Sequence, residues 1–223
     1  MRHTVLASFA SSILLGAMSA TVPALTADAA APIAAVPPSK ALDFKPTEMR
    51  LYRDPESGGH FWYFTYTVTN KTGKDQRFAP RIEMVNDDGK TVALGQDVPS
   101  RVVRDLKKLL NDPLVVDQFS ILGDLLQGEE NAKTGLLVFR VPPMTELDRK
   151  VGAPKNAAEN FEPVELTVFV QGLSSESKTV PNPKTGEPVR LRANLPLTFS
   201  VPGDPTANLA ASYKPTVGEW IFR

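Results

Sequence analysis

Residues 60–69 read HFWYFTYTVT, and every residue after the histidine is aromatic or β-branched. Such residues favour β-strands, in which successive side chains point to opposite faces. One face of this strand therefore carries four core-type side chains: Trp62, Phe64, Tyr66 and Val68. The other face carries two further large rings, Phe61 and Tyr63, which need either a cover or a partner.

The same period of two returns near the end of the chain, over residues 189–201. Seven apolar residues alternate there without a break: Val189, Leu191, Ala193, Leu195, Leu197, Phe199 and Val201. Pro196 falls on the opposite face and has no backbone N–H to donate. The alternation predicts a long strand, and Pro196 predicts an open edge or a bulge within it.

Further strands are expected on either side of these two, separated by turns and by one helix. The expected strands are residues 49–52, 78–85, 91–94, 114–122, 135–141 and 162–172, with a polar loop at 128–133. Turn residues such as Asp88-Gly89 favour hairpins because glycine accepts a positive φ. From Ser100 to Leu110 the apolar residues repeat at helical spacing, with Ser100 placed as the N-cap and Asn111 and Pro113 ending the segment. The pattern predicts a mainly β fold, an antiparallel β-sandwich of about eight strands with one short inserted amphipathic helix.

Composition narrows the classes of function. The 223 residues include 25 Lys and Arg against 25 Asp and Glu, so no net charge steers the chain toward nucleic acid. Cysteine is absent, which excludes disulfides, thiolate metal sites, cysteine nucleophiles and the acylated cysteine of a bacterial lipoprotein.

The first residues are typical of an export signal. A basic start precedes an apolar run over residues 5–20, and Ala27-Asp28-Ala29 offers small residues for cleavage. Interrupting serines and Pro23 argue against a retained transmembrane anchor. We therefore expect a signal peptide (1–29), an Ala/Pro-rich lead-in (30–46), a β-sandwich domain (47–203) and a C-terminal tail packing on that domain (204–223). The expected compartment is the periplasm or the outside of the cell.

Several turns and core segments carry a resemblance to known proteins: Val68–Asp75, Asn86–Lys90, His60–Tyr66, the helix after Val98-Pro99-Ser100, Phe169–Ser174 and Glu219-Trp220. Together they resemble a family of exported bacterial proteins with an immunoglobulin-like β-sandwich domain. The resemblance covers most of residues 43–223. It implies an immunoglobulin-like fold and an exported protein, and it implies no catalytic activity, because the shared motifs are turns and core residues.

No motif predicts a cofactor, a metal site or a catalytic triad. His60 is the only histidine after the expected cleavage point, and no Gly-x-Ser-x-Gly stretch supplies a nucleophile. A hydrolase remains an alternative if carboxylates meet in the folded chain. The candidates are Asp87, Asp88, Asp117, Glu129 and Glu130.

Two surfaces are candidates for binding. Phe61 and Tyr63 either lie under the helix or under residues 220–222, or form an exposed face that binds a partner or stacks sugars. Arg101, Arg104 and Lys108 recur on one side of the helix and either dock a phosphate or acidic partner or form a solvated face. We expect an exported, non-catalytic binding or structural module with an envelope protein or polymer as its partner. A carbohydrate-binding module is the other alternative.

Overall fold

The structure is a computed structural model, and it describes residues 38, 40–86, 89–141 and 164–223. The expected signal peptide, most of the lead-in, Asp87 and Asp88 lie outside the described residues. Within these residues the chain is mainly β, with one α-helix, α1 (Ser100–Leu110), and one short 3-10 helix (Pro205–Ala207). The predicted mainly β class with one inserted helix is confirmed. No helix in the described part of the chain has the length and apolar character to cross a membrane.

The first sheet has six strands around the aromatic strand β3. The strands are β1 (Asp43–Pro46), β2 (Met49–Arg53), β3 (His60–Asn70), β7 (Val115–Val116), β9 (Gly128–Arg140) and β13 (Ser212–Tyr213). Their order is β13-β2-β3-β9-β7, and β1 also pairs with β3. Trp62 lies opposite Leu51 of β2 and Phe139 of β9. These pairings are antiparallel, and β7 runs parallel to β9.

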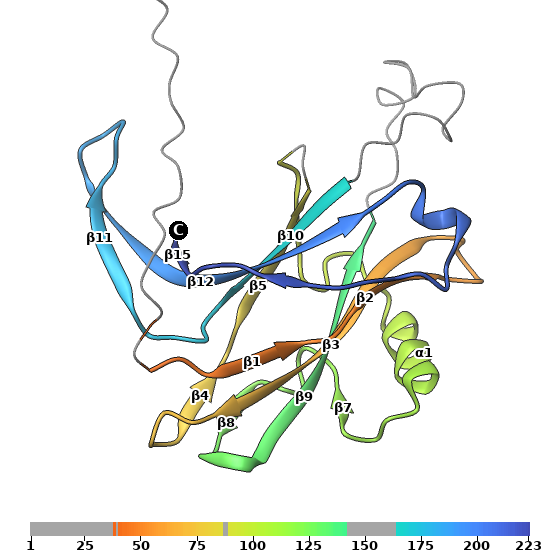
Figure 1. Cartoon of the computed structure of the whole chain (residues 1–223), viewed down its shortest axis with the longest axis horizontal. Helices are drawn as coiled ribbons and strands as arrows, with labels where there is room; N and C mark the ends of the chain where they lie inside the picture. Colours follow the sequence, from red (N-terminus) through yellow and green to blue (C-terminus); the bar gives the residue numbers. More distant parts are fainter. Residues whose placement is uncertain (1–37, 39, 87–88, 142–163) are drawn as a thin grey trace, which may run out of the picture. The chain divides into compact units, whose positions relative to one another are not determined.

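The second sheet has seven strands around β12. They are β5 (Arg81–Asn86), β6 (Thr91–Ala93), β10 (Val164–Gln171), β11 (Ser177–Pro181), β12 (Pro188–Val201), β14 (Thr216–Val217) and β15 (Ile221–Phe222). Their order is β11-β12-β10-β5-β6, and β14 and β15 each pair with β12 as well. Figure 1 shows the β11–β12 hairpin reaching out beyond the rest of the sheet. A small third sheet joins β4 (Gln76–Phe78) to β8 (Gly123–Leu125).

The main core lies between the two large sheets. Trp62, Phe64 and Tyr66 of β3 are buried together with alternate residues of β10 and β12. The rings of Phe64 and Phe199, one from each sheet, have centroids 5.2 Å apart. Burial of these apolar side chains drives the two sheets together. The alternation predicted for residues 60–69 and 189–201 is confirmed.

The helix covers the opposite face of the first sheet. Phe61 and Tyr63 are 1% and 8% exposed, and they pack with Val102 and Leu106 of α1. Val102 and Leu106 lie one turn apart on α1, so both reach the cluster around Phe61 and Tyr63. Figure 1 shows where α1 lies in the fold. Of the two covers considered, the helix is the one that forms. An exposed face of Phe61 and Tyr63 that binds a partner or stacks sugars is therefore wrong.

Three sequence-based boundaries need correction. Ser100 does not cap the helix, because Pro99 is the N-cap residue and no side chain there hydrogen-bonds the first turn. The lead-in was expected to continue to Pro46, whereas β1 begins at Asp43. The expected strand 114–122 is reduced to β7, and Leu114 and Phe119, on either side of it, are both 74% exposed.

The segment 128–133 is a strand rather than a loop. β9 begins at Gly128, which pairs with Asn70. Val68 pairs with Lys133 and Asn70 pairs with Gly128, so the register shifts between them and residues 129–132 of β9 bulge out of the ladder. The polar residues of this segment lie in the irregular pairing at the start of β9.

Pro196 pairs with Phe169 of β10, whereas neither β14 nor β15 pairs with Pro196 itself. β14 pairs at Leu197 and Thr198, and β15 pairs at Ala193 and Asn194. Between them, the backbone N–H of Gly218 donates to the carbonyl of Pro196 at 2.9 Å. Residues 204–223, expected as a tail that packs on the domain, contribute β13 to one sheet and β14 and β15 to the other.

Candidate functional site

Arg101 is paired within the chain rather than free for a ligand. Its guanidinium forms ion pairs with Asp54 and Glu56 of the loop before β3. The Asp54 carboxylate is almost fully buried. The Ser57 hydroxyl, then the backbone N–H groups of Glu56 and Ser57, then Arg101 hold the pKa of Asp54 below its usual value, against the effect of desolvation. Arg101 thus fastens the helix to this loop, and its role in binding stays a prediction.

The other two helix cations predicted for binding, Arg104 and Lys108, remain at the surface. Arg104 is exposed, and the Lys108 ammonium lies 3.8 Å from the Asp105 carboxylate on the preceding turn. The structure does not combine them with Arg101 into one anion site, because Arg101 turns toward the loop at residues 54–56. A role for Arg104 and Lys108 in binding stays a prediction.

Asp117, a predicted candidate for a hydrolytic site, is used in local structure. Its carboxylate accepts hydrogen bonds from the backbone N–H groups of Phe119 and Ser120, at 2.9 and 3.0 Å, and from the Ser120 hydroxyl at 2.7 Å. Burial alone would raise the pKa of Asp117, and these hydrogen bonds outweigh it and lower that pKa. The carboxylate therefore stabilises the turn that follows β7.

Glu129 lies 2.7 Å from the ammonium of Lys71, and this contact lowers the pKa of Glu129 and raises that of Lys71. Glu130 contacts Asn131 at 3.4 Å. Within the described ranges, no three His, Asp or Glu side chains gather where they would hold a metal ion. His60 is half-buried at the start of β3, and its carbonyl accepts from the N–H of Val141 at 2.9 Å.

A hollow of about 590 Å³ lies where β1 gives way to β2. We call it the edge hollow, and it is lined by Pro46, Thr47, Glu48, Arg50, Thr65, Lys214 and Pro215. β1 and β2 both pair with β3, and the chain leaves the ladder between them at residues 47–48. The Thr47 hydroxyl fixes this break: it lies 3.0 Å from the Thr65 carbonyl, 3.1 Å from the Thr65 N–H and 3.1 Å from the Thr65 hydroxyl.

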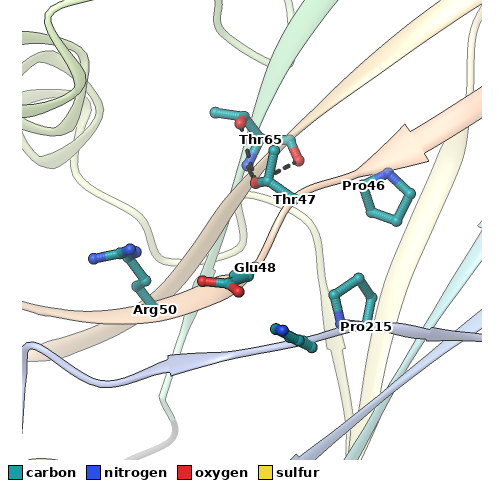
Figure 2. A pocket seen from close by; sticks show the side chains of 7 residues that line it. Pro46, Thr47, Glu48, Arg50, Thr65 and Pro215 are labelled. Carbon is teal, nitrogen blue, oxygen red and sulfur yellow. Dashed lines mark hydrogen bonds between the residues drawn. The ribbon is translucent and has the colours of Figure 1, made fainter.

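The opposite wall of the edge hollow comes from the end of the chain. Residues 214–215 connect β13 of the first sheet to β14 of the second, so they pass along the border of both sheets. Figure 2 shows Glu48 between Arg50 and the ring of Pro215, with the Thr47–Thr65 contact to one side. The edge hollow thus forms only because the chain passes from the first sheet to the second at residues 214–215 and so lies beside residues 46–50.

Charges of both signs line the edge hollow. Arg50 and Lys214 are exposed, and Glu48 is half-buried. In the described part of the chain, no ion pair engages any of the three. They therefore remain available to a partner that carries complementary charges.

Comparisons of the chain with family models, with curated proteins and with solved structures gave no match.

The sequence did not reveal the edge hollow. Its residues come from separate segments around positions 46–50, 65 and 214–215, and they follow no motif. The one local signal is Thr65, a polar residue on the face of the aromatic strand that Phe61 and Tyr63 also occupy. Only the pairing of β1, β2 and β13 around β3 assembles them.

Proposed function

We propose that this chain is an exported, non-catalytic β-sandwich module of the bacterial envelope that binds an envelope protein or polymer through the edge hollow. The proposed domain is immunoglobulin-like. Two largely antiparallel sheets packed across one core support that part of the proposal, together with the turns and core segments that resemble the exported family. The N-terminal sequence pattern supports export.

One observation carries the binding proposal: Glu48, Arg50 and Lys214 bring unpaired charges from two distant segments into one open hollow. Small-molecule sites usually enclose most of their ligand. The edge hollow lies open along the border of the sheets, so an extended chain or a protein surface fits it better. A partner with alternating charges would pair with all three side chains.

A hydrolase is the second candidate in the sequence, and the described residues give it less support. Asp117 and Glu129 are engaged in a turn and an ion pair. Asp87 and Asp88 lie outside the described residues. A carbohydrate-binding surface on Phe61 and Tyr63 is not proposed again, since the helix covers both rings.

The test is capture of a partner from the envelope fraction of the source organism. We expect the unaltered protein to retain a partner at low salt and to release it as salt rises, because exposed charges are screened. Arg50→Glu combined with Lys214→Glu should reduce capture by about tenfold or more, since it replaces two attractive contacts with repulsive ones.

A matched control carries the same change of charge at a distance from the hollow. Lys74→Glu combined with Lys184→Glu alters two exposed lysines in turns and should leave capture unchanged. Near-UV circular dichroism checks that both double variants keep the fold. Equal capture by the two folded double variants would contradict the proposed role of the edge hollow.

A further inference from the structure

A second hollow, of about 210 Å³, lies on the second sheet and shares no residue with the edge hollow. We call it the face hollow, and it is lined by Arg81, Glu83, Gln171, Asn194 and Arg223. At about 30 Å³ for each water molecule, it has room for one small polar molecule. It is too small for a drug-sized ligand, for which pockets of about 300 Å³ or more are typical.

Strand register builds the floor of the face hollow. Gln171 of β10 lies opposite Arg81 of β5 on one side and opposite Asn194 of β12 on the other. Their neighbours in sequence include Ile82, Val170 and Leu195, all of which are buried in the main core. Because side chains alternate along a strand, the row of Arg81, Gln171 and Asn194 faces away from that core.

Arg223 closes one side of the face hollow and is held firmly. Its guanidinium lies 2.6 Å from the Glu83 carboxylate and 4.0 Å above the ring of Phe169. Its backbone exchanges two hydrogen bonds with Arg192, of 3.0 and 3.2 Å. The Phe169 face is therefore occupied, and a ligand here would be recognised by polar contacts rather than by stacking.

Three polar side chains in this row keep unused bonding capacity. Among the described residues, Arg81 forms no ion pair and the Gln171 side chain forms no hydrogen bond. Asn194 is 3% exposed, its Nδ2 donates to the Arg192 carbonyl at 2.9 Å, and no hydrogen bond within the described residues engages its Oδ1. The Asn194 Oδ1 therefore remains free to accept a hydrogen bond from a ligand.

We propose that the face hollow binds a small hydroxy-carboxylate, the class to which sugar acids belong. Two arginines and one glutamate leave one net positive charge for a carboxylate. The free Arg81 guanidinium presents a planar pair of donors that matches a carboxylate. The amides of Gln171 and Asn194 offer both donors and acceptors, which suits hydroxyl groups that also donate and accept. This inference does not depend on the proposed role of the edge hollow.

The test is an NMR titration that follows the side-chain amide signals of Gln171 and Asn194 in the purified protein. D-glucuronate is the probe, acetate has the carboxylate without the hydroxyls, and D-glucose has the hydroxyls without the carboxylate. We expect glucuronate to shift both signals saturably, and to bind about tenfold or more tightly than either acetate or glucose. No saturable shift with glucuronate, or equal affinity for acetate or glucose, would overturn the proposal.

Two variants assign the binding to the face hollow. Arg81→Gln removes the free guanidinium from an exposed position and should weaken glucuronate binding about tenfold or more. Arg77→Gln removes an exposed arginine that does not line the hollow and should leave the affinity unchanged. Equal affinity of the two folded variants would overturn the assignment of Arg81.

Discussion

Trp62 is almost fully buried in the main core, where its ring meets Tyr213 edge to face with centroids 5.8 Å apart. Trp62→Ala removes this burial and leaves a cavity, so we expect the free energy of unfolding to fall by about 3–5 kcal/mol. Urea unfolding measures the change.

Phe119→Ala is the matched control for Trp62→Ala, because Phe119 is 74% exposed and its truncation should change the stability by about 0.5 kcal/mol or less. A loss below about 1 kcal/mol for Trp62→Ala would show that the face of β3 that carries Trp62 does not form the core.

Asp54 gives the fold a predictable response to acid. Its pKa is lowered from 3.8 in the folded protein, chiefly by the Ser57 hydroxyl. A carboxylate whose pKa is lower in the folded protein than in the unfolded chain stabilises the fold at pH values above the unfolded-state pKa. This contribution is lost as the pH falls through the folded-state pKa. We therefore expect the stability advantage of the unaltered protein over Asp54→Asn to be full near neutral pH and to shrink as the pH falls below 3.8.

Urea midpoints at several pH values measure this difference. The control is Asp124→Asn, which alters an exposed aspartate whose carboxylate has no ion pair within the described residues. Its effect on stability should stay small at every pH. A stability difference for Asp54→Asn that does not change with pH would contradict the account of this loop.

At the scale of elements, the helix serves as the cover of the first sheet. Leu106 is fully buried against Phe61 and Tyr63, whereas Leu109, on the same helix, is 62% exposed. Leu106→Ala should therefore cost about 2–5 kcal/mol, and Leu109→Ala should cost about 0.5 kcal/mol or less. Equal effects of the two variants on the urea midpoint would show that the helix does not pack on this face.

Gly135 of β9 allows the first sheet to pack closely. A Cβ atom there would lie 2.6 Å from the Tyr66 ring and 2.7 Å from Ile121 Cδ1. Gly135→Ala should therefore overpack the core and lower the stability by about 1–3 kcal/mol. Adding Ile121→Val removes that Cδ1, so thermal unfolding of the double variant should show a loss smaller than the sum of the two single losses. Additive losses would contradict this contact.

Sequence patterns predicted the elements that alternate between a core face and a polar or covered face. The strands β3, β10 and β12 and the helix meet this condition. Residues 114–122 look like a strand because they are apolar, yet several of these side chains are exposed and a turn held by Asp117 replaces the pairing. The two-residue strands β13, β14 and β15 are too short for any period to show, because they exist only by pairing with strands far away in the sequence.

At the scale of the whole molecule, both hollows depend on contacts between distant segments. The edge hollow joins positions 46–50 and 65 to positions 214–215, and the face hollow joins β5, β10 and β12 to Arg223. Residue types alone favoured Phe61, Tyr63 and Arg101 as binding residues. Packing uses the first two and an ion pair uses the third, while unremarkable residues such as Thr65 and Gln171 line the hollows.

The central claim is that two sheets close on one core while the helix covers the outer face of β3. The direct measurement is an NMR spectrum of nuclear Overhauser contacts between aromatic and methyl protons of the purified protein. We expect contacts between the rings of Phe64 and Phe199, across the two sheets, and between the ring of Phe61 and the methyl groups of Leu106. Absence of both sets of contacts in a folded, well-resolved spectrum would contradict this account.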